Sequence, residues 1–248
     1  MSSSSQERIL FIAGGTDGIG FSLLIAECKR CKYSKIYVLG RNFDRFHHQL
    51  KKQLLLNTRS VPDIVELSCD ITQQDEIKTT LSRIKDESIH DFILTIGTFH
   101  RGKIADITHE DIVANHFHLN CISTINLIRS ILTKLVKGQS QILVCTASVA
   151  VTARSPYGLQ SCTKAALRSF IDTLRIELKG TTRVMNIMPP SVDTRIFSKA
   201  GDHRNTDIYP PPVRVVVGMQ YMLDCPFDIC IPELLIEQHQ FDEQQLPG

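Results

Sequence analysis

The chain has 248 residues, of which 42% are hydrophobic and 22% are charged, and its formal net charge is +2. This composition is that of an ordinary globular protein, and the length allows one domain with a full hydrophobic core. Twenty-eight lysines and arginines stand against 26 acidic residues, which argues against a nucleic-acid partner. We expect a flexible polar N-terminus at 1–8, one folded domain at 9–240 and a C-terminal tail at 241–248.

The predicted strands are seven short apolar runs, separated by longer segments that each have room for a helix. The runs lie at residues 9–13, 36–39, 64–67, 92–96, 142–145, 184–188 and 229–236. Such alternation is typical of a parallel sheet with helices on both faces. The sequence therefore predicts a single-domain, doubly wound α/β fold.

Two of the helices carry start signals. Residues 108–111 have the spacing of a capping box, which predicts a helix that runs to Lys137. Ser155 and Pro156 offer an N-cap followed by proline at the first helical position, and Gly180 can end that second helix.

Two histidines and one proline-rich stretch in these segments are explained by structure alone. We interpret His116 and His118 as surface or packing residues, because residues two apart do not share a helix face. The stretch 194–212 contains turn residues and three consecutive prolines, and we expect a mobile substrate loop there.

Neither a membrane nor a metal is expected as a partner. No apolar run reaches the roughly 18 residues that a transmembrane helix needs, and residues 1–8 lack the features of a signal peptide. We therefore expect a cytoplasmic protein with reduced cysteines. Cys28 and Cys31 have the spacing of half a zinc or redox site, but no second pair follows at ligand spacing.

A glycine-rich segment follows the first apolar run. Gly14, Gly18 and Gly20 stand between that run and a helical segment at 21–32. Glycines allow the strand to turn sharply into the helix and the backbone to approach a pyrophosphate closely. The helix N-terminus then offers N–H groups and a positive dipole to the anion. The pattern predicts a dinucleotide-binding loop.

These glycines match the GxxxGxG motif of the short-chain dehydrogenase/reductase family, which the chain resembles over nearly its whole length. The other matching segments are Cys69-Asp70-Ile71, Asn120, Thr146-Ala147-Ser148, Lys164-Ala165-Ala166-Leu167 and Pro189-Pro190-Ser191-Val192-Asp193-Thr194. The resemblance implies one Rossmann-type domain with a seven-stranded parallel sheet. It also implies an oxidoreductase acting on a carbonyl or alcohol, as a dimer or tetramer built through the fourth and fifth helices.

The resemblance also implies roles for individual residues. Catalytic positions are Asn120, Ser148, Gln160 and Lys164. Cofactor contacts are expected from Gly14, Thr16, Gly18, Ile19, Gly20, Arg41, Asn42, Asp70, Ile71, Gly97, Lys164, Pro189, Val192 and Thr194.

The end of the second run favours NADP(H) over NAD(H). In dinucleotide-binding folds an acidic residue there accepts from the ribose 2′-OH, whereas an arginine accommodates the 2′-phosphate. Here the segment contains Arg41 and Asn42 and no carboxylate, and a guanidinium binds phosphate well. Two points count against this interpretation: Arg41 is also explained as a solvated surface residue, and the Asp17 carboxylate would repel a 2′-phosphate.

The proton donor of the family is missing. The family uses Tyr-x-x-x-Lys, and four residues before Lys164 stands Gln160, whose amide does not exchange a proton near neutral pH. Tyr157 lies seven residues before Lys164, about 10 Å away along a helix, so we do not expect it to substitute. Ile96 and Pro190 also depart from the family pattern. Enzymatic turnover therefore stays an open question.

Three functional classes remain. The first is an NADP-dependent oxidoreductase that uses another acid, such as Ser161, Tyr157 or water. The second is a nucleotide-binding pseudoenzyme that acts as a sensor or scaffold, and the third is an interaction protein that has kept only the fold. Ser148 and Lys164 can still hold a ligand in the first two classes, although a local turn bond and a solvated helix face explain them as well.

Overall fold

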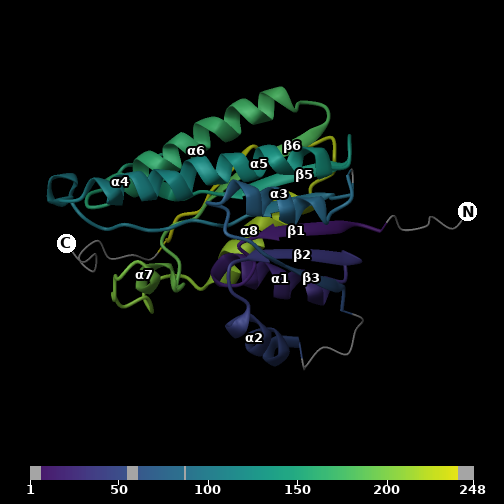
Figure 1. The fold of residues 1–248 in the computed structure, drawn as a ribbon, viewed down its shortest axis with the longest axis horizontal. Helices are drawn as coiled ribbons and strands as arrows, with labels where there is room; N and C mark the ends of the chain where they lie inside the picture. The colour runs from purple at the N-terminus through teal and green to yellow at the C-terminus, as the bar shows by residue number, and fades with distance from the viewer. Residues whose placement is uncertain (1–6, 55–60, 87, 240–248) are drawn as a thin grey trace, which may run out of the picture.

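The computed structural model describes residues 7–54, 61–86 and 88–239, and its centre is one sheet of seven parallel strands in the order β3-β2-β1-β4-β5-β6-β7 (Figure 1). The strands are β1 (Ile9–Ala13), β2 (Lys35–Gly40), β3 (Asp63–Ser68), β4 (Asp91–Leu94), β5 (Ser140–Cys145), β6 (Thr182–Met188) and β7 (Glu233–Leu235). The predicted doubly wound α/β fold is confirmed. Except for residues 7 and 8, the segments 1–8 and 241–248 lie outside the described residues.

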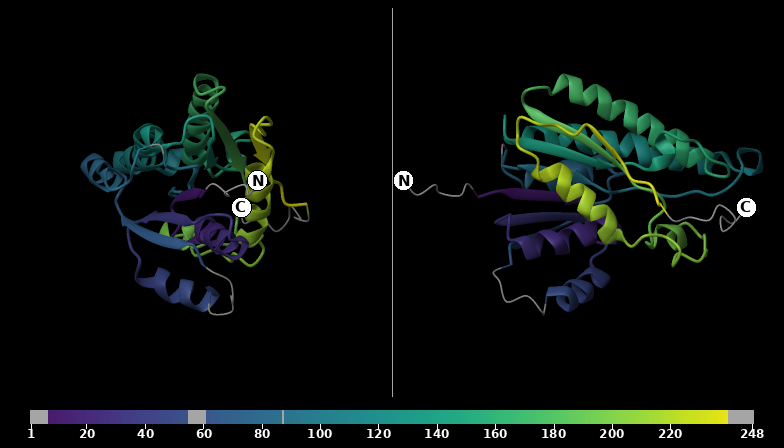
Figure 2. Two further views of the ribbon diagram at one scale, coloured as in Figure 1. Left: turned by 90° about the vertical axis from the view of Figure 1, so that its right-hand side faces the viewer. Right: turned by 180° about the vertical axis from the view of Figure 1, so that it is seen from behind.

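Helices cover both faces of the sheet (Figures 1 and 2). They are α1 (Gly18–Arg30), α2 (Asp44–Leu54), α3 (Gln74–Ser82), α4 (Glu110–Phe117), α5 (Thr124–Ile131), α6 (Gly158–Glu177), α7 (Ile196–Lys199) and α8 (Pro212–Asp224). Buried residues of α3, α5 and α6 form the core on one face, and those of α1 and α8 form the core on the other.

The strands are apolar throughout because both of their faces are buried. Along β1, Phe11 and Ala13 belong to one core, whereas Leu10 and Ile12 belong to the other, and all four are fully buried. Successive side chains of a strand point to opposite faces, so a central strand needs apolar residues at every position. This is why the apolar runs marked the strands.

The chain reverses direction across the sheet between β1 and β4. After β1 the next two strands are added on one side, and β4 is then placed on the other side of β1. The carboxyl ends of β1 and β4 therefore border a crevice, which is where open α/β sheets bind their ligands. The glycine-rich loop at 14–20 lies at this point.

The two predicted helix starts are wrong. The residue before α4 is His109, not Thr108, and it makes no side-chain cap hydrogen bond. The Ser155–Pro156 peptide is cis, and α6 begins only at Gly158 because the chain still turns at Tyr157.

The predicted helix to residue 137 is also interrupted. A π-helical stretch at His118–Ser123 separates α4 from α5, and the Thr124 hydroxyl bonds the Leu119 carbonyl five residues back. Gly180, with a φ of +85°, lies three residues beyond the end of α6.

The thiols show no sign of a reactive pair. None of the eight cysteines, all of which lie in the described ranges, forms a disulfide. Burial, together with the nearby Glu27, raises the pKa of the Cys28 thiol to about 12, so this group stays protonated at neutral pH. In the described ranges no three His, Cys, Asp or Glu side chains are grouped to hold a metal ion, and no helix has the length and apolarity to cross a bilayer.

Candidate functional site

The glycine-rich loop has the backbone that its sequence predicts. Gly14 has a φ of +92°, a conformation that L side chains rarely adopt. A Cβ atom at Gly20 would lie 2.4 Å from the Gly14 carbonyl oxygen, so only glycine lets α1 begin this close to β1. The carboxylate of Asp17 caps α1 by accepting from the Gly18 N–H at 2.9 Å. The helix N-terminus therefore opens into the crevice at the carboxyl end of β1.

The end of β2 lies beside this loop. A Cβ atom at Gly40 would lie 2.4 Å from the Thr16 side chain, which places the two segments in contact. Arg41 follows with a side chain that is 70% exposed, and its guanidinium is 4.0 Å from the Asp70 carboxylate. Asn42 is used locally, because its side-chain oxygen accepts from the Asp44 N–H at 2.8 Å. Arg41 is thus the residue here whose charged group remains available to an anion.

Asp70 is ionised at neutral pH. Its partial burial raises its pKa, but hydrogen bonds from the Thr72 backbone and hydroxyl, with a smaller effect of Arg41, outweigh this and lower the pKa below its usual value. The side chain of Ile71 is 4% exposed and belongs to the core. Asp70 is therefore the polar member of this motif.

Gln160, at the position that the sequence predicts for the acid, lies in the first turn of α6, and the structure places a histidine beside it. Gln160 and His116 are both buried, and the Gln160 side-chain oxygen lies 3.0 Å from His116 Nε2. The Asn120 amide nitrogen also lies 3.0 Å from that Nε2. His116 is thus a buried packing residue and not a surface one, and the packing of α4 on α6 brings its ring against the side chains of Asn120 and Gln160.

The hydrogen-bond network assigns the proton on His116. The Asn120 side-chain oxygen accepts from the Thr98 N–H at 2.8 Å, and its Nδ2 has two oxygen acceptors, the Thr98 carbonyl at 3.2 Å and the Thr163 hydroxyl at 3.3 Å. Both amide hydrogens are thereby used. Because the Gln160 oxygen can only accept, its hydrogen bond with His116 requires the imidazole to donate from Nε2.

His116 is neutral at pH 7. Burial lowers its pKa to about 4, and the hydrogen bond with Gln160 offsets only part of this effect. The charge of Lys164 and the nearby ring of His100 also disfavour the imidazolium form. A neutral imidazole fixes the orientation of Gln160 but supplies no readily transferable proton.

The side chain of Lys164 is buried, and no described residue pairs with its ammonium group. Its side chain is 4% exposed, and a Cβ atom at Gly97 would lie 3.2 Å from its Nζ and 3.3 Å from the Asn120 side-chain oxygen. Within the described ranges its ammonium makes no hydrogen bond or ion pair, and burial lowers its pKa. A buried charge without partners is costly. The hydroxyl groups of a nucleotide ribose would supply the missing acceptors, so the residues present fit a dinucleotide.

Ser148 lies next to this group. It begins a short 3₁₀ turn, Ser148–Ala150, that packs against α6, and its backbone N–H donates to the Pro189 carbonyl at 2.8 Å. This bond joins the segments that follow β5 and β6. In the described part of the chain no acceptor or donor engages the Ser148 hydroxyl.

The alternative acids are differently placed. The Tyr157 hydroxyl accepts from Arg204 at 3.1 Å, and its ring centroid lies 5.9 Å from that of Phe99, so the phenol is held by the segment after β6. The Ser161 hydroxyl is buried, and no described residue hydrogen-bonds it. Neither residue is paired with Lys164.

The segment after β6 lies against the glycine loop at the crevice. Val192 is 5% exposed and packs in the core, and Thr194 approaches the glycine loop, with its methyl group 3.3 Å from the position of a Cβ at Gly18. The loop predicted at 194–212 contains the short helix α7.

The structure thus brings the predicted residues together in two places at one edge of the sheet. The glycine loop, Arg41, Asp70 and Thr194 lie at the carboxyl ends of β1, β2 and β3, and Ser148, Asn120, Gln160 and Lys164 lie where α6 meets β4 and β5. The sequence reasoning missed His116. Its spacing of four from Asn120 was an available signal, because residues four apart share a helix face.

Comparisons with known proteins identify the family of the chain and several of its relatives. A family model described as short chain dehydrogenase matches residues 8–205. The 11-beta-hydroxysteroid dehydrogenase 1A of Arabidopsis thaliana is 24% identical over 233 residues, which cover 85% of this chain and 63% of that protein. The 3-ketodihydrosphingosine reductase of Yarrowia lipolytica is 25% identical over 201 residues, covering 76% and 52%. The chain therefore spans less than two thirds of the length of these relatives.

Solved structures share the fold. An alcohol dehydrogenase from the archaeon Thermococcus sibiricus, complexed with 5-hydroxy-NADP, superposes with a TM-score of 0.76 at 20% identity and covers 95% of this chain and 100% of that one. A short-chain dehydrogenase from Sphingobium yanoikuyae in complex with NADPH gives 0.74 at 17% identity, covering 92% and 86%. With the family model matched over 8–205, this chain belongs to the short-chain dehydrogenase family.

Proposed function

We propose that this protein is an NADP(H)-binding oxidoreductase of the short-chain dehydrogenase family that acts on a carbonyl or alcohol substrate with impaired or non-standard proton transfer. The buried and unpartnered Lys164, next to a glycine loop shaped for a pyrophosphate, carries the proposal. The NADP and NADPH complexes of its structural neighbours support it. We further propose that it works in the cytoplasm as a dimer or tetramer. Analytical ultracentrifugation tests the oligomeric state.

Each residue of the site then has a task. The dinucleotide, when bound, would supply or accept the hydride. The N–H groups at the start of α1 bind the pyrophosphate, Arg41 binds the 2′-phosphate and Lys164 binds the nicotinamide ribose. The Ser148 hydroxyl and the Gln160 amide hydrogen-bond the substrate oxygen and orient the carbonyl. Residues 194–212 form the wall of the substrate site.

This site lacks a side chain that readily donates a proton to the substrate. A carbonyl that accepts a hydride must also receive a proton, and neither an amide nor the neutral imidazole of His116 gives one up readily near pH 7. We therefore expect that the protein binds the nucleotide but reduces simple aldehydes and ketones very slowly.

The same observation supports a second candidate function, a catalytically inactive nucleotide-binding protein that acts as a sensor or scaffold. Gln160 is buried and fixed by His116, so the acid position offers no proton of its own. Wild-type turnover over a panel of carbonyl substrates, measured by the loss of NADPH absorbance, separates the two candidates.

Cofactor preference is the first testable consequence. We expect wild type to bind NADPH more tightly than NADH, and Arg41→Ala to remove this preference. A charge-assisted hydrogen bond to the 2′-phosphate is worth about 1.5–3 kcal/mol, or roughly 10- to 150-fold in Kd. Titration of both cofactors by fluorescence measures it. Arg83→Ala, an exposed arginine just after α3, serves as the matched control. Equal wild-type affinities for the two cofactors would contradict the role of Arg41.

A further inference from the structure

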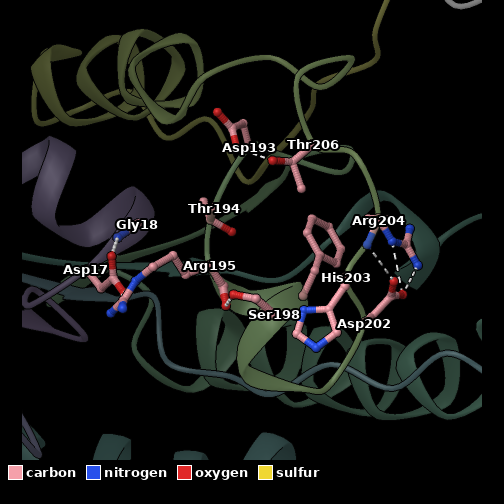
Figure 3. A pocket seen from close by; sticks show the side chains of 11 residues that line it. Asp17, Gly18, Asp193, Thr194, Arg195, Ser198, Asp202, His203, Arg204 and Thr206 are labelled. Carbon is pink, nitrogen blue, oxygen red and sulfur yellow. Dashed lines mark hydrogen bonds and ion pairs between the residues drawn. The ribbon is translucent and has the colours of Figure 1, made fainter.

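Asp17 carries two cations that come from a distant part of the chain. Its Oδ2 accepts from Arg195 Nε at 2.9 Å and Nη2 at 2.6 Å, and it lies 2.8 Å from the Lys199 ammonium. Figure 3 shows Arg195 reaching from the segment after β6 to Asp17, which at the same time caps α1 through the Gly18 N–H. These contacts join the glycine loop to α7.

The cluster of Asp17, Arg195 and Lys199 has a positive net charge, whereas the sequence suggested a negative charge at Asp17. Burial of Asp17 raises its pKa, but the hydrogen bonds from Lys199 and Arg195 outweigh this and lower the pKa below its usual value, so the carboxylate is ionised at neutral pH. One negative and two positive groups leave a net charge of +1 beside the N-terminus of a 13-residue helix. The repulsion of phosphate expected from Asp17 alone is therefore reversed.

The two cations keep donors for a further acceptor. Arg195 uses Nε and Nη2 on Asp17, and Lys199 uses one of its three hydrogens. In the described residues nothing else pairs with Arg195 Nη1 or the remaining ammonium hydrogens. Their side chains are 43% and 55% exposed, and Arg195 lines an open cavity that also reaches Gly18, at the start of α1.

Other side chains of the segment that carries these cations are paired with one another. The Thr206 hydroxyl donates to Asp193 at 2.6 Å across the cavity, and Arg204 pairs with Asp202 (Figure 3). The guanidinium of Arg204 lies 4.7 Å from the ring centroid of Phe197, within the range for a cation–π contact. Residues 193–206 therefore form a folded strap that carries Arg195 and Lys199 to the glycine loop.

We propose that Arg195 and Lys199 bind the pyrophosphate of the dinucleotide, and that Asp17 holds both cations in position for it. This inference rests on the proposed function, because it assigns further ligands for the same cofactor. The pyrophosphate is common to NADPH and NADH, whereas Arg41 faces the 2′-phosphate. The strap then closes over the nucleotide by a charge contact that the glycine motif does not contain.

The test is the affinity of the double variant Arg195→Gln/Lys199→Gln for both cofactors. We expect Kd to rise by about 10- to 100-fold for NADPH and by the same factor for NADH, because charge-assisted contacts to a shared group are lost. Arg83→Gln/Lys179→Gln removes two exposed positive charges near the opposite edge of the sheet and serves as the control for net charge. This control is expected to bind both cofactors like wild type.

A second measurement does not depend on affinity alone. In wild type, saturating NADPH is expected to slow backbone hydrogen exchange in residues 194–206, and at equal saturation the double variant is expected to show less of this slowing. Equal protection in both proteins would contradict a strap that closes through these cations.

Each outcome of the titration has a separate meaning. A loss confined to NADPH would move the two cations to the 2′-phosphate and overturn the assignment to the pyrophosphate. Unchanged binding of both cofactors would overturn the inference while leaving the proposed function in place. A wild-type protein that binds neither cofactor would overturn the proposed function and, with it, this inference.

Discussion

Replacing Gln160 by tyrosine is expected to raise the carbonyl reductase activity far above the very slow rate that we expect of the parent protein. The phenol would stand one helical turn before the Lys164 ammonium, which favours the ionised phenol and so lowers its pKa. Proton transfer from a positioned acid contributes about 10²- to 10⁴-fold to a rate. The rate of NADPH oxidation over a panel of aldehydes and ketones, with each variant shown to be folded and to bind NADPH, measures this gain.

The matched control is Gln160→Phe, which adds the same ring without the hydroxyl. It is expected to turn over no faster than wild type, so that a gain in the tyrosine variant is due to the proton and not to the shape of the pocket. Robust wild-type turnover that survives both Tyr157→Phe and Ser161→Ala would contradict the assignment of Gln160 to the acid position.

The largest expected effect on stability comes from Asp91→Ala. Asp91 is the first residue of β4 and is fully buried. Its carboxylate accepts from Arg8 at 2.8 Å and from the Tyr33 hydroxyl. Burial and the charge of Asp91 raise the pKa of Tyr33 well above its usual value, so the phenol stays neutral and donates. Removing the carboxylate leaves both donors unpaired, which costs about 3–5 kcal/mol.

Urea denaturation measures this loss as a lower midpoint at an unchanged m-value. Asp75→Ala is the matched control, because Asp75 pairs with Lys78 on the surface and its side chain is 94% exposed. Such a pair is worth about 0–1 kcal/mol. A midpoint for Asp91→Ala equal to that of the control would contradict a structural role for the buried cluster.

The sheet could be predicted from the sequence because its strands are buried on both faces. Six of the seven apolar runs differ from the observed strands by no more than two residues at either end, whereas the last run, at 229–236, contains only the three residues of β7. Strand β7 is at the edge and packs less completely, so its pattern is weaker. Helix starts were harder, because Thr108 and Ser155 have the right chemistry for caps but the chain enters α4 and α6 later.

Motif matching found the residues of the candidate site that lie on the glycine loop and α6, since their spacing is local. It did not find His116 or Arg195, because their partners are 44 and 178 residues away along the chain. Contacts of this kind depend on how α4 packs on α6 and how the segment after β6 returns to α1. Asp17 illustrates the consequence: its sequence position suggested a negative phosphate loop, and its distant partners make that loop positive.

A crystal structure of the protein grown with NADP tests the central claim most directly. We expect the pyrophosphate against residues 14–20, the 2′-phosphate within hydrogen-bonding distance of Arg41, and the nicotinamide ribose against the Lys164 ammonium, with Gln160 facing the substrate position. A crystal at saturating NADP in which this crevice holds no nucleotide, or holds it with the ribose away from Lys164, would contradict the claim.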